Sequence, residues 1–109
     1  MWKIEGEHLT GVTTASYVTA LDWSGPELRE KSLHLKNTHL SASMYYKVLA
    51  NYHNDQVAGN EDEIVGETSL SAGEDVRLTL NNLYNRIYIL VKQNSGPGTY
   101  ELNYIGQGA

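Results

Sequence analysis

Residues 75–92 read Asp-Val-Arg-Leu-Thr-Leu-Asn-Asn-Leu-Tyr-Asn-Arg-Ile-Tyr-Ile-Leu-Val-Lys. Polar and apolar side chains alternate through residues 75–80, which is the period of a strand with one buried face. In residues 86–92 both alternating sets contain apolar or aromatic side chains, so we expect this strand to be central in its sheet or covered by another chain. Asn81 and Asn82 mark a turn between the two segments. The stretch therefore predicts two β-strands.

The same period of two recurs outward from this stretch. Its apolar sets are Leu33 and Leu35, then Met44, Tyr46, Val48, Ala50 and Tyr52, then Tyr100, Leu102 and Tyr104. Residues 12–23 are rich in Thr, Val, Tyr and Ala, which favours a strand, but their pattern does not fix the buried face. Only residues 25–31 are compatible with a helical turn. Turn signals every 8–12 residues predict an all-β, antiparallel β-sandwich, immunoglobulin-like or jelly-roll-like, with about seven to eight strands.

The length of 109 residues fits one domain. We expect a single sandwich over residues 12–109, preceded by residues 1–11 as either an edge strand or an N-terminal arm that docks on a neighbouring subunit. Trp2 and Ile4 would anchor such an arm, because a large apolar ring is costly to leave in water.

Composition excludes several classes of protein. The absence of cysteine removes disulfides, thiol catalysis and cysteine-ligated metals. The longest apolar run, residues 87–91, is far shorter than the ~20 residues of a membrane-spanning helix, so we expect no membrane partner. A net charge of −5 with scattered bases argues against nucleic acid. The acidic residue at position 5 argues against a secretory leader.

Candidate catalytic and metal sites are weak in this sequence. The four histidines lack ligand spacing, and no Gly-x-Ser-x-Gly turn is present, so we expect no cofactor, no metal and no enzyme. Residues 54–63 have oxygen ligands without the spacing of a calcium loop. Residues 61–75 hold six acids and no base, which leaves open a solvated face, a docking surface for a basic partner or a weak cation site.

Tyrosine supplies most of the aromatic content, with eight Tyr, two Trp and no Phe. Strand alternation places Tyr45 and Tyr46 on opposite faces of the sheet. It also places Tyr88 on the face opposite to its neighbours in the sequence, so some tyrosines must face outward. Outward tyrosines either stabilise cross-strand pairs, pack against another subunit or stack on sugar rings.

The segments at residues 33–38, 45–48 and 68–80 resemble a recurrent immunoglobulin-like pattern, in which residues 84–91 and Gly98-Thr99-Tyr100-Glu101-Leu102 look like the closing hairpin. Small chains of this kind are similar to structural proteins of tailed bacteriophages, including capsid decoration proteins and accessory head or tail proteins. This resemblance implies oligomerisation on a virion assembled in the host cytoplasm, a capsid or other virion protein as partner, and no catalytic residues.

Pattern and resemblance together predict a non-enzymatic structural virion protein that decorates or cements a capsid. Its expected interface residues are Trp2, Ile4, Tyr45, Tyr88 and Leu90. The alternative is a carbohydrate-binding or adhesin module that uses an outward tyrosine or Trp23 as a stacking platform.

Overall fold

Eight strands make up the described part of the chain, which in this computed structural model comprises residues 3–24, 30–51, 62–80, 86–93 and 97–108. The strands are β1 (Lys3–Thr13), β2 (Val18–Ser24), β3 (Glu30–Asn37), β4 (Met44–Asn51), β5 (Asp62–Leu70), β6 (Asp75–Leu80), β7 (Arg86–Gln93) and β8 (Gly98–Gly108). Residues 25–29 of the proposed helical turn lie outside the described residues, and Glu30 and Lys31 begin β3. Among the described residues, no helix has the length and apolar character needed to cross a membrane.

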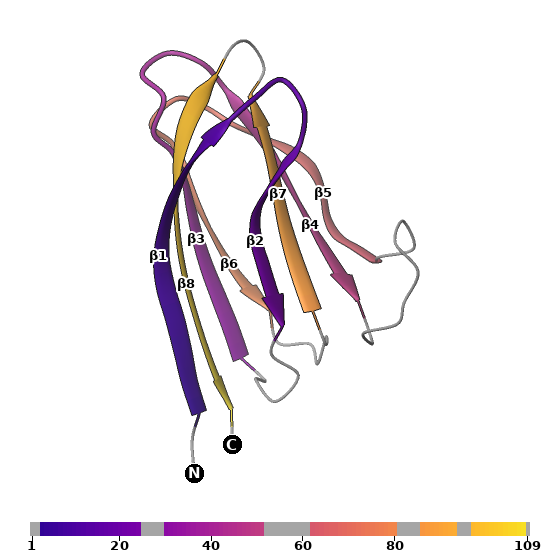
Figure 1. Ribbon diagram of the computed structural model, residues 1–109. Coiled ribbons are helices and arrows are strands. Elements are labelled where there is room, and N and C mark those ends of the chain that lie inside the picture. Colours follow the sequence, from indigo (N-terminus) through magenta and orange to yellow (C-terminus); the bar gives the residue numbers. More distant parts are fainter. Residues whose placement is uncertain (1–2, 25–29, 52–61, 81–85, 94–96, 109) are drawn as a thin grey trace.

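The strands form two four-stranded antiparallel sheets that pack face to face (Figure 1). Sheet A has the order β1-β8-β3-β6, and sheet B has the order β2-β7-β4-β5. This order is that of a jelly roll, which confirms the predicted antiparallel sandwich and selects the jelly-roll alternative. The expected closing hairpin is wrong, because β7 pairs with β2 and β4 whereas β8 pairs with β1 and β3.

The core lies between the sheets and follows the predicted alternation. In β4 and β7 every second side chain is buried. β7 is central in its sheet, which is one of the two arrangements that its two apolar faces predicted. Sheet B contributes Leu21, Trp23, Met44, Tyr46, Val48, Ala50, Leu70, Ile87, Ile89 and Val91, and sheet A contributes Leu33, Leu35, Leu80, Tyr100 and Leu102. Burial of these side chains is the main stabilising contribution to the fold.

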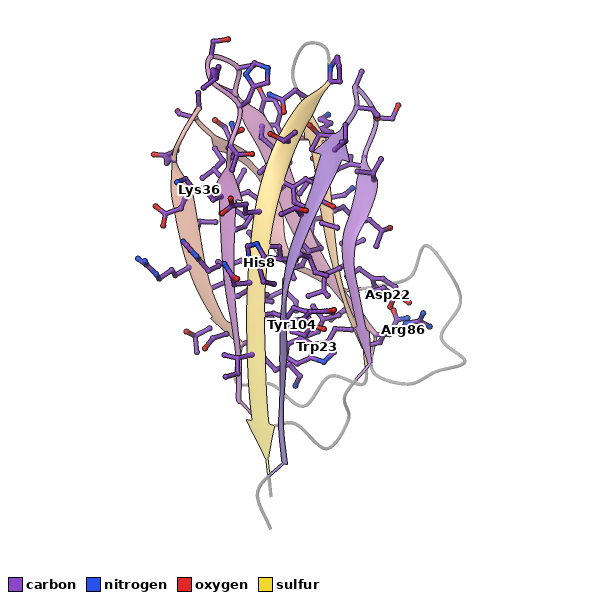
Figure 2. All side chains as sticks on the ribbon, turned by 60° about the vertical axis from the view of Figure 1, so that its left-hand side comes forward. His8, Asp22, Trp23, Lys36, Arg86 and Tyr104 are labelled. Carbon is purple, nitrogen blue, oxygen red and sulfur yellow. The ribbon has the colours of Figure 1, made fainter. Side chains whose placement is uncertain are left out.

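Trp23 belongs to this core. The register of β2 against β7 shifts between Thr19 and Leu21, so the simple alternation of residues 12–23 breaks there. Beyond the shift Trp23 points inward and is only 4% exposed. Its ring lies 4.6 Å from the ring of Tyr104 in the opposite sheet, tilted by 55° (Figure 2). Trp23 is therefore not an outward stacking platform, which leaves an outward tyrosine for that role in the carbohydrate alternative.

Residues 3–13 form an edge strand, β1, which pairs with β8 along its whole length. Gly11 allows this pairing, because a Cβ at this position would lie 2.3 Å from the hydroxyl of Tyr100. Trp2 lies outside the described residues. Ile4 lies in β1 opposite Gln107, and its side chain is likewise outside the description.

Candidate functional site

Three of the predicted interface residues share the outer face of sheet B. Tyr45 comes from β4, and Tyr88 and Leu90 come from the neighbouring strand β7; all three are half-buried. Each alternates with a core side chain, which fixes its outward direction. We call the outward side chains of this sheet and of the residue before β2 the sheet B face. Its members are Tyr17, Thr19, Asp22, Tyr45, Lys47, Leu49, Asn51, Glu63, Glu67, Ser69, Arg86, Tyr88, Leu90 and Lys92.

A cation–aromatic cluster occupies one end of the sheet B face. The Lys92 ammonium lies 4.8 Å from the ring centre of Tyr17 and 5.6 Å from that of Tyr45. The Lys47 ammonium lies 4.5 Å from the Tyr17 ring. Tyr17 donates a hydrogen bond to Glu67, whose carboxylate also pairs with Lys92 at 3.1 Å. These contacts hold two lysines and two tyrosines in fixed positions.

The same contacts shift two pKa values. Burial, followed by the hydrogen bond to Glu67, raises the pKa of Tyr17 well above its usual range. The Tyr17 hydroxyl, followed by Lys92, lowers the pKa of the Glu67 carboxyl. Near neutral pH the cluster therefore consists of a neutral phenol beside a charged ion pair.

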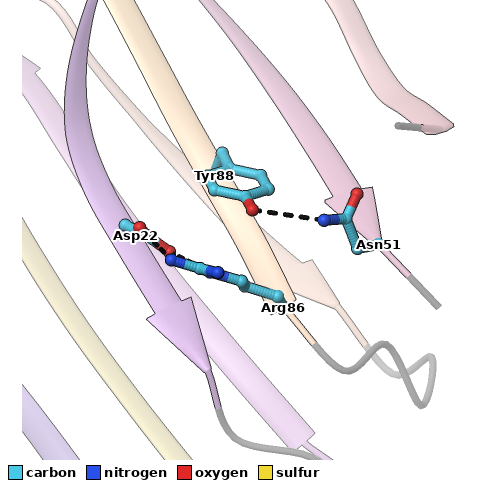
Figure 3. Close-up of polar contacts among 4 residues, drawn as sticks. All are labelled: Asp22, Asn51, Arg86 and Tyr88. Carbon is cyan, nitrogen blue, oxygen red and sulfur yellow. Dashed lines mark hydrogen bonds and ion pairs between the residues drawn. The ribbon is translucent and has the colours of Figure 1, made fainter. Parts of the chain in front are cut away.

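A second cluster lies at the start of β7 (Figure 3). Arg86 donates two hydrogen bonds of 2.6 Å to the two carboxylate oxygens of Asp22, which raises the pKa of the guanidinium. The guanidinium lies 5.2 Å from the ring centre of Tyr88. Asn51 donates to the Tyr88 hydroxyl over 3.2 Å. Both side chains of the ion pair are more than one-third exposed, so solvent screens their attraction and the pair contributes little to stability.

The main consequence of these clusters is that neighbouring contacts restrict the side chains of an outward surface. Tyrosine and arginine are the residue types that dominate protein–protein interfaces. Side chains already held by neighbours lose less conformational entropy when a partner covers them. The sheet B face therefore combines the chemistry and the preorganisation of an interface.

The acidic segment at residues 61–75 is not one surface in the described part of the chain. Glu67 lies in β5 of sheet B and pairs with Lys92, whereas Asp75 lies in β6 of sheet A and pairs with His34 at 2.5 Å. The described residues contain no group of three or more acids and histidines arranged to hold a metal ion. Residues 54–61 of the loop considered for calcium lie outside the description.

Sequence patterns identified part of this face. The structure brings Tyr45, Tyr88 and Leu90 together, but places Ile4 in the edge strand of the other sheet. Tyr17 and the two clusters were missed. Tyr17 lies in the segment whose alternation could not be interpreted, and its partner Glu67 is 50 positions away.

No protein-family model and no curated protein sequence matches this chain. Solved structures do match it. The chain is similar to a protein of Bacillus endospore appendages, described as disulfide-linked pili, with 11% identity over 99% of this chain and 89% of that chain and a TM-score of 0.59. These 109 residues contain no cysteine, so the disulfide linkage of that protein does not carry over.

Two further matches concern a prophage and a virus. The SPBc2 prophage-derived protein YomS is 9% identical over 95% of this chain and 96% of that chain, with a TM-score of 0.55. A chain of infectious bursal disease virus is 8% identical over 97% of this chain and 32% of that chain, with a TM-score of 0.59. At these identities the likeness shows the β-sandwich fold alone.

Proposed function

We propose that this domain is a non-enzymatic structural protein of a virion, which decorates or cements a capsid by packing against copies of itself and against the shell. The observation that carries the proposal is the gathering of Tyr45, Tyr88 and Leu90 on one outer face. Membranes and nucleic acid have no part in this function.

The two ordered clusters support this role. In a contact through the sheet B face, Leu90 would supply apolar area, while Lys92 and Arg86 would remain paired with their own carboxylates. A partner would then cover charges that are already neutralised locally, which reduces the desolvation cost of burying them. The pilus, prophage and viral matches are compatible with an assembly role for the fold.

Repetition would make such a contact strong. One face of a 109-residue domain offers a modest contact area. On a particle, each copy would meet both the shell and its neighbours, so the second contact forms at a high effective concentration. Weak individual contacts would then hold the domain firmly.

Size-exclusion chromatography with light scattering tests the proposal. We expect the wild-type chain to have a mass above that of one chain at high concentration. A double variant, Tyr88→Ser with Leu90→Ser, should remain monomeric, because it removes an aromatic and an aliphatic side chain from the centre of the face.

The matched control is Ile105→Ser, which removes a 54% exposed aliphatic side chain from the other sheet and should leave the mass unchanged. Far-ultraviolet circular dichroism establishes that each variant is folded. A wild-type chain that is monomeric at every concentration, or an Ile105→Ser variant that dissociates like the double variant, contradicts the proposal.

A further inference from the structure

The outer face of sheet A contains a depression of about 270 Å³ between two rows of side chains. Strand register places Asn103, His34 and Arg77 side by side across β8, β3 and β6, and it places Ile105, Ser32 and Thr79 in the row two residues away. The residues between the rows, Leu33, Leu78 and Tyr104, complete the lining. The depression is thus built from three consecutive residues of each of three strands.

Two rim side chains are held in place by partners outside the depression. Asn103 Oδ1 accepts a hydrogen bond of 2.6 Å from Nδ1 of His8, on the edge strand β1 (Figure 2). This bond occupies the carbonyl oxygen of the amide, so that its NH₂ group keeps its donors for another partner. His34 Nε2 donates to the Asp75 carboxylate over 2.5 Å, which lowers the pKa of that carboxyl. The rim is therefore preorganised.

Arg77 supplies the main charge of the rim. Its side chain is 79% exposed, and its guanidinium reaches the Asp75 carboxylate only at 3.9 Å, which is beyond hydrogen-bond distance. Asp75 is instead held closely by His34. The planar guanidinium fork is therefore available to bind an oxyanion with two parallel hydrogen bonds.

The remaining groups restrict the ligand further. Ser32 and Thr79 offer hydroxyls, which both donate and accept, and Ile105 offers an apolar surface that is 54% exposed. A matching ligand needs a carboxylate, several hydroxyls and one face of C–H groups. The volume of the depression lies below the usual range of small-molecule sites, which favours a single small ring.

We propose that this depression binds a sugar residue that carries a carboxylate, with Arg77 holding the carboxylate, Asn103, Ser32 and Thr79 hydrogen-bonded to the ring hydroxyls, and Ile105 packed on the C–H face. The ligand is a free uronic acid or a uronic acid unit of an acidic polysaccharide. The site is separate from the sheet B face, because it lies on the outer side of the opposite sheet.

Amide chemical-shift titrations of the full chain test the proposal, with glucuronate and galacturonate, their short oligomers, glucose and acetate as probes. We expect a uronate to shift the amides of residues 32–34, 77–79 and 103–105 and to bind at least tenfold more tightly than glucose or acetate. Oligomers that bind more tightly than the monosaccharide identify a polysaccharide as the source, and equal affinities identify the free sugar acid.

Variants assign the role of each group. Arg77→Gln should weaken uronate binding at least tenfold, because it removes the charge and the fork, and Arg77→Lys should restore only part of the affinity. The matched control is Lys36→Gln, which removes one positive charge from the same face outside the depression (Figure 2). This control should leave the affinity unchanged.

Three results would overturn the proposal. The first is the absence of shifts at the depression with every uronate probe. The second is an affinity for acetate or glucose equal to that for the uronates. The third is an Arg77→Gln variant that binds as the wild type does while its spectrum shows an intact fold. None of these results bears on self-association through sheet B.

Discussion

The two outer faces of the sandwich differ in chemistry although their strands share one core. At the centre of sheet B, β7 presents Tyr88 and Leu90 outward, whereas at the centre of sheet A, β3 and β8 present His34 and Asn103. Figure 2 shows Lys36 and the Asp22–Arg86 pair on opposite sides of the molecule. The inward positions determine the fold, and the outward positions are free to differ in function.

The faces also differ in how their polar groups are satisfied. On the sheet B face, Lys92 and Arg86 are each paired with a carboxylate and lie near a tyrosine ring. On sheet A, Arg77 is mostly exposed and lies 3.9 Å from its nearest carboxylate. A surface with satisfied charges suits burial under another subunit, whereas an available guanidinium suits a solvated ligand site. The comparison therefore supports the proposed packing through one face and the proposed ligand binding on the other.

Trp23→Ala should have the largest effect, because Trp23 lies in the core that both faces share. The substitution removes a buried ring that contacts Tyr104 across the sandwich, and we expect it to lower the free energy of unfolding by about 3–5 kcal/mol. Urea denaturation followed by tyrosine fluorescence measures this loss. A Trp23→Ala variant as stable as the wild type would contradict the buried position of Trp23.

Asn37→Ala should have an intermediate effect, because Asn37 connects the two sheets. This fully buried side chain donates to the carbonyls of Ala42 and Leu70, over 2.9 and 3.0 Å, and accepts from the amide of His39. Leaving such groups unsatisfied costs about 2–3 kcal/mol. The control is Asn103→Ala on the outer face of sheet A, for which we expect a loss of about 0.5 kcal/mol. If thermal denaturation shows equal losses of stability in Asn37→Ala and Asn103→Ala, the hydrogen bonds of Asn37 do not contribute to holding the two sheets together.

Lowering the pH should have the smallest effect on stability, and this effect should come from carboxylates on both faces. Glu67 on sheet B and Asp75 on sheet A have lowered pKa values in the fold, so their stabilising contribution is complete above the ordinary carboxyl pKa, near pH 4, and is lost as the pH falls through the folded values. We expect the urea midpoint to decline less steeply below about pH 4 in Glu67→Gln and Asp75→Asn than in the wild type. A wild-type midpoint that stays constant over this range contradicts both shifts.

The sequence was sufficient to predict which side of most strands is buried. Alternation in β4 and β7 assigned Met44, Val48 and Ile89 to the core and Tyr45 and Leu90 to the surface, because the side-chain period of a strand is two. It failed in β2, because the register shift between Thr19 and Leu21 interrupts that period. For the same reason, the buried position of Trp23 could not be predicted from the pattern.

Neighbouring strands could not be predicted, and both candidate surfaces depend on them. Alternation gives the face of a residue but not the strand beside it, so Tyr17 beside Glu67 and His34 beside Asn103 follow only from the jelly-roll strand order. The expected hairpin of β7 and β8 was wrong for the same reason. Contacts between residues distant in sequence are set by topology, which a local pattern does not contain.

The most direct test of the central claim is to measure which face responds to self-association. Amide chemical shifts of the wild-type chain, recorded from low to high protein concentration, report this residue by residue. We predict concentration-dependent shifts at residues 45, 88 and 90 on sheet B, and constant shifts at residues 34, 77 and 103 on sheet A. Shifts confined to sheet A, or no shifts at any residue, would contradict assembly through the sheet B face.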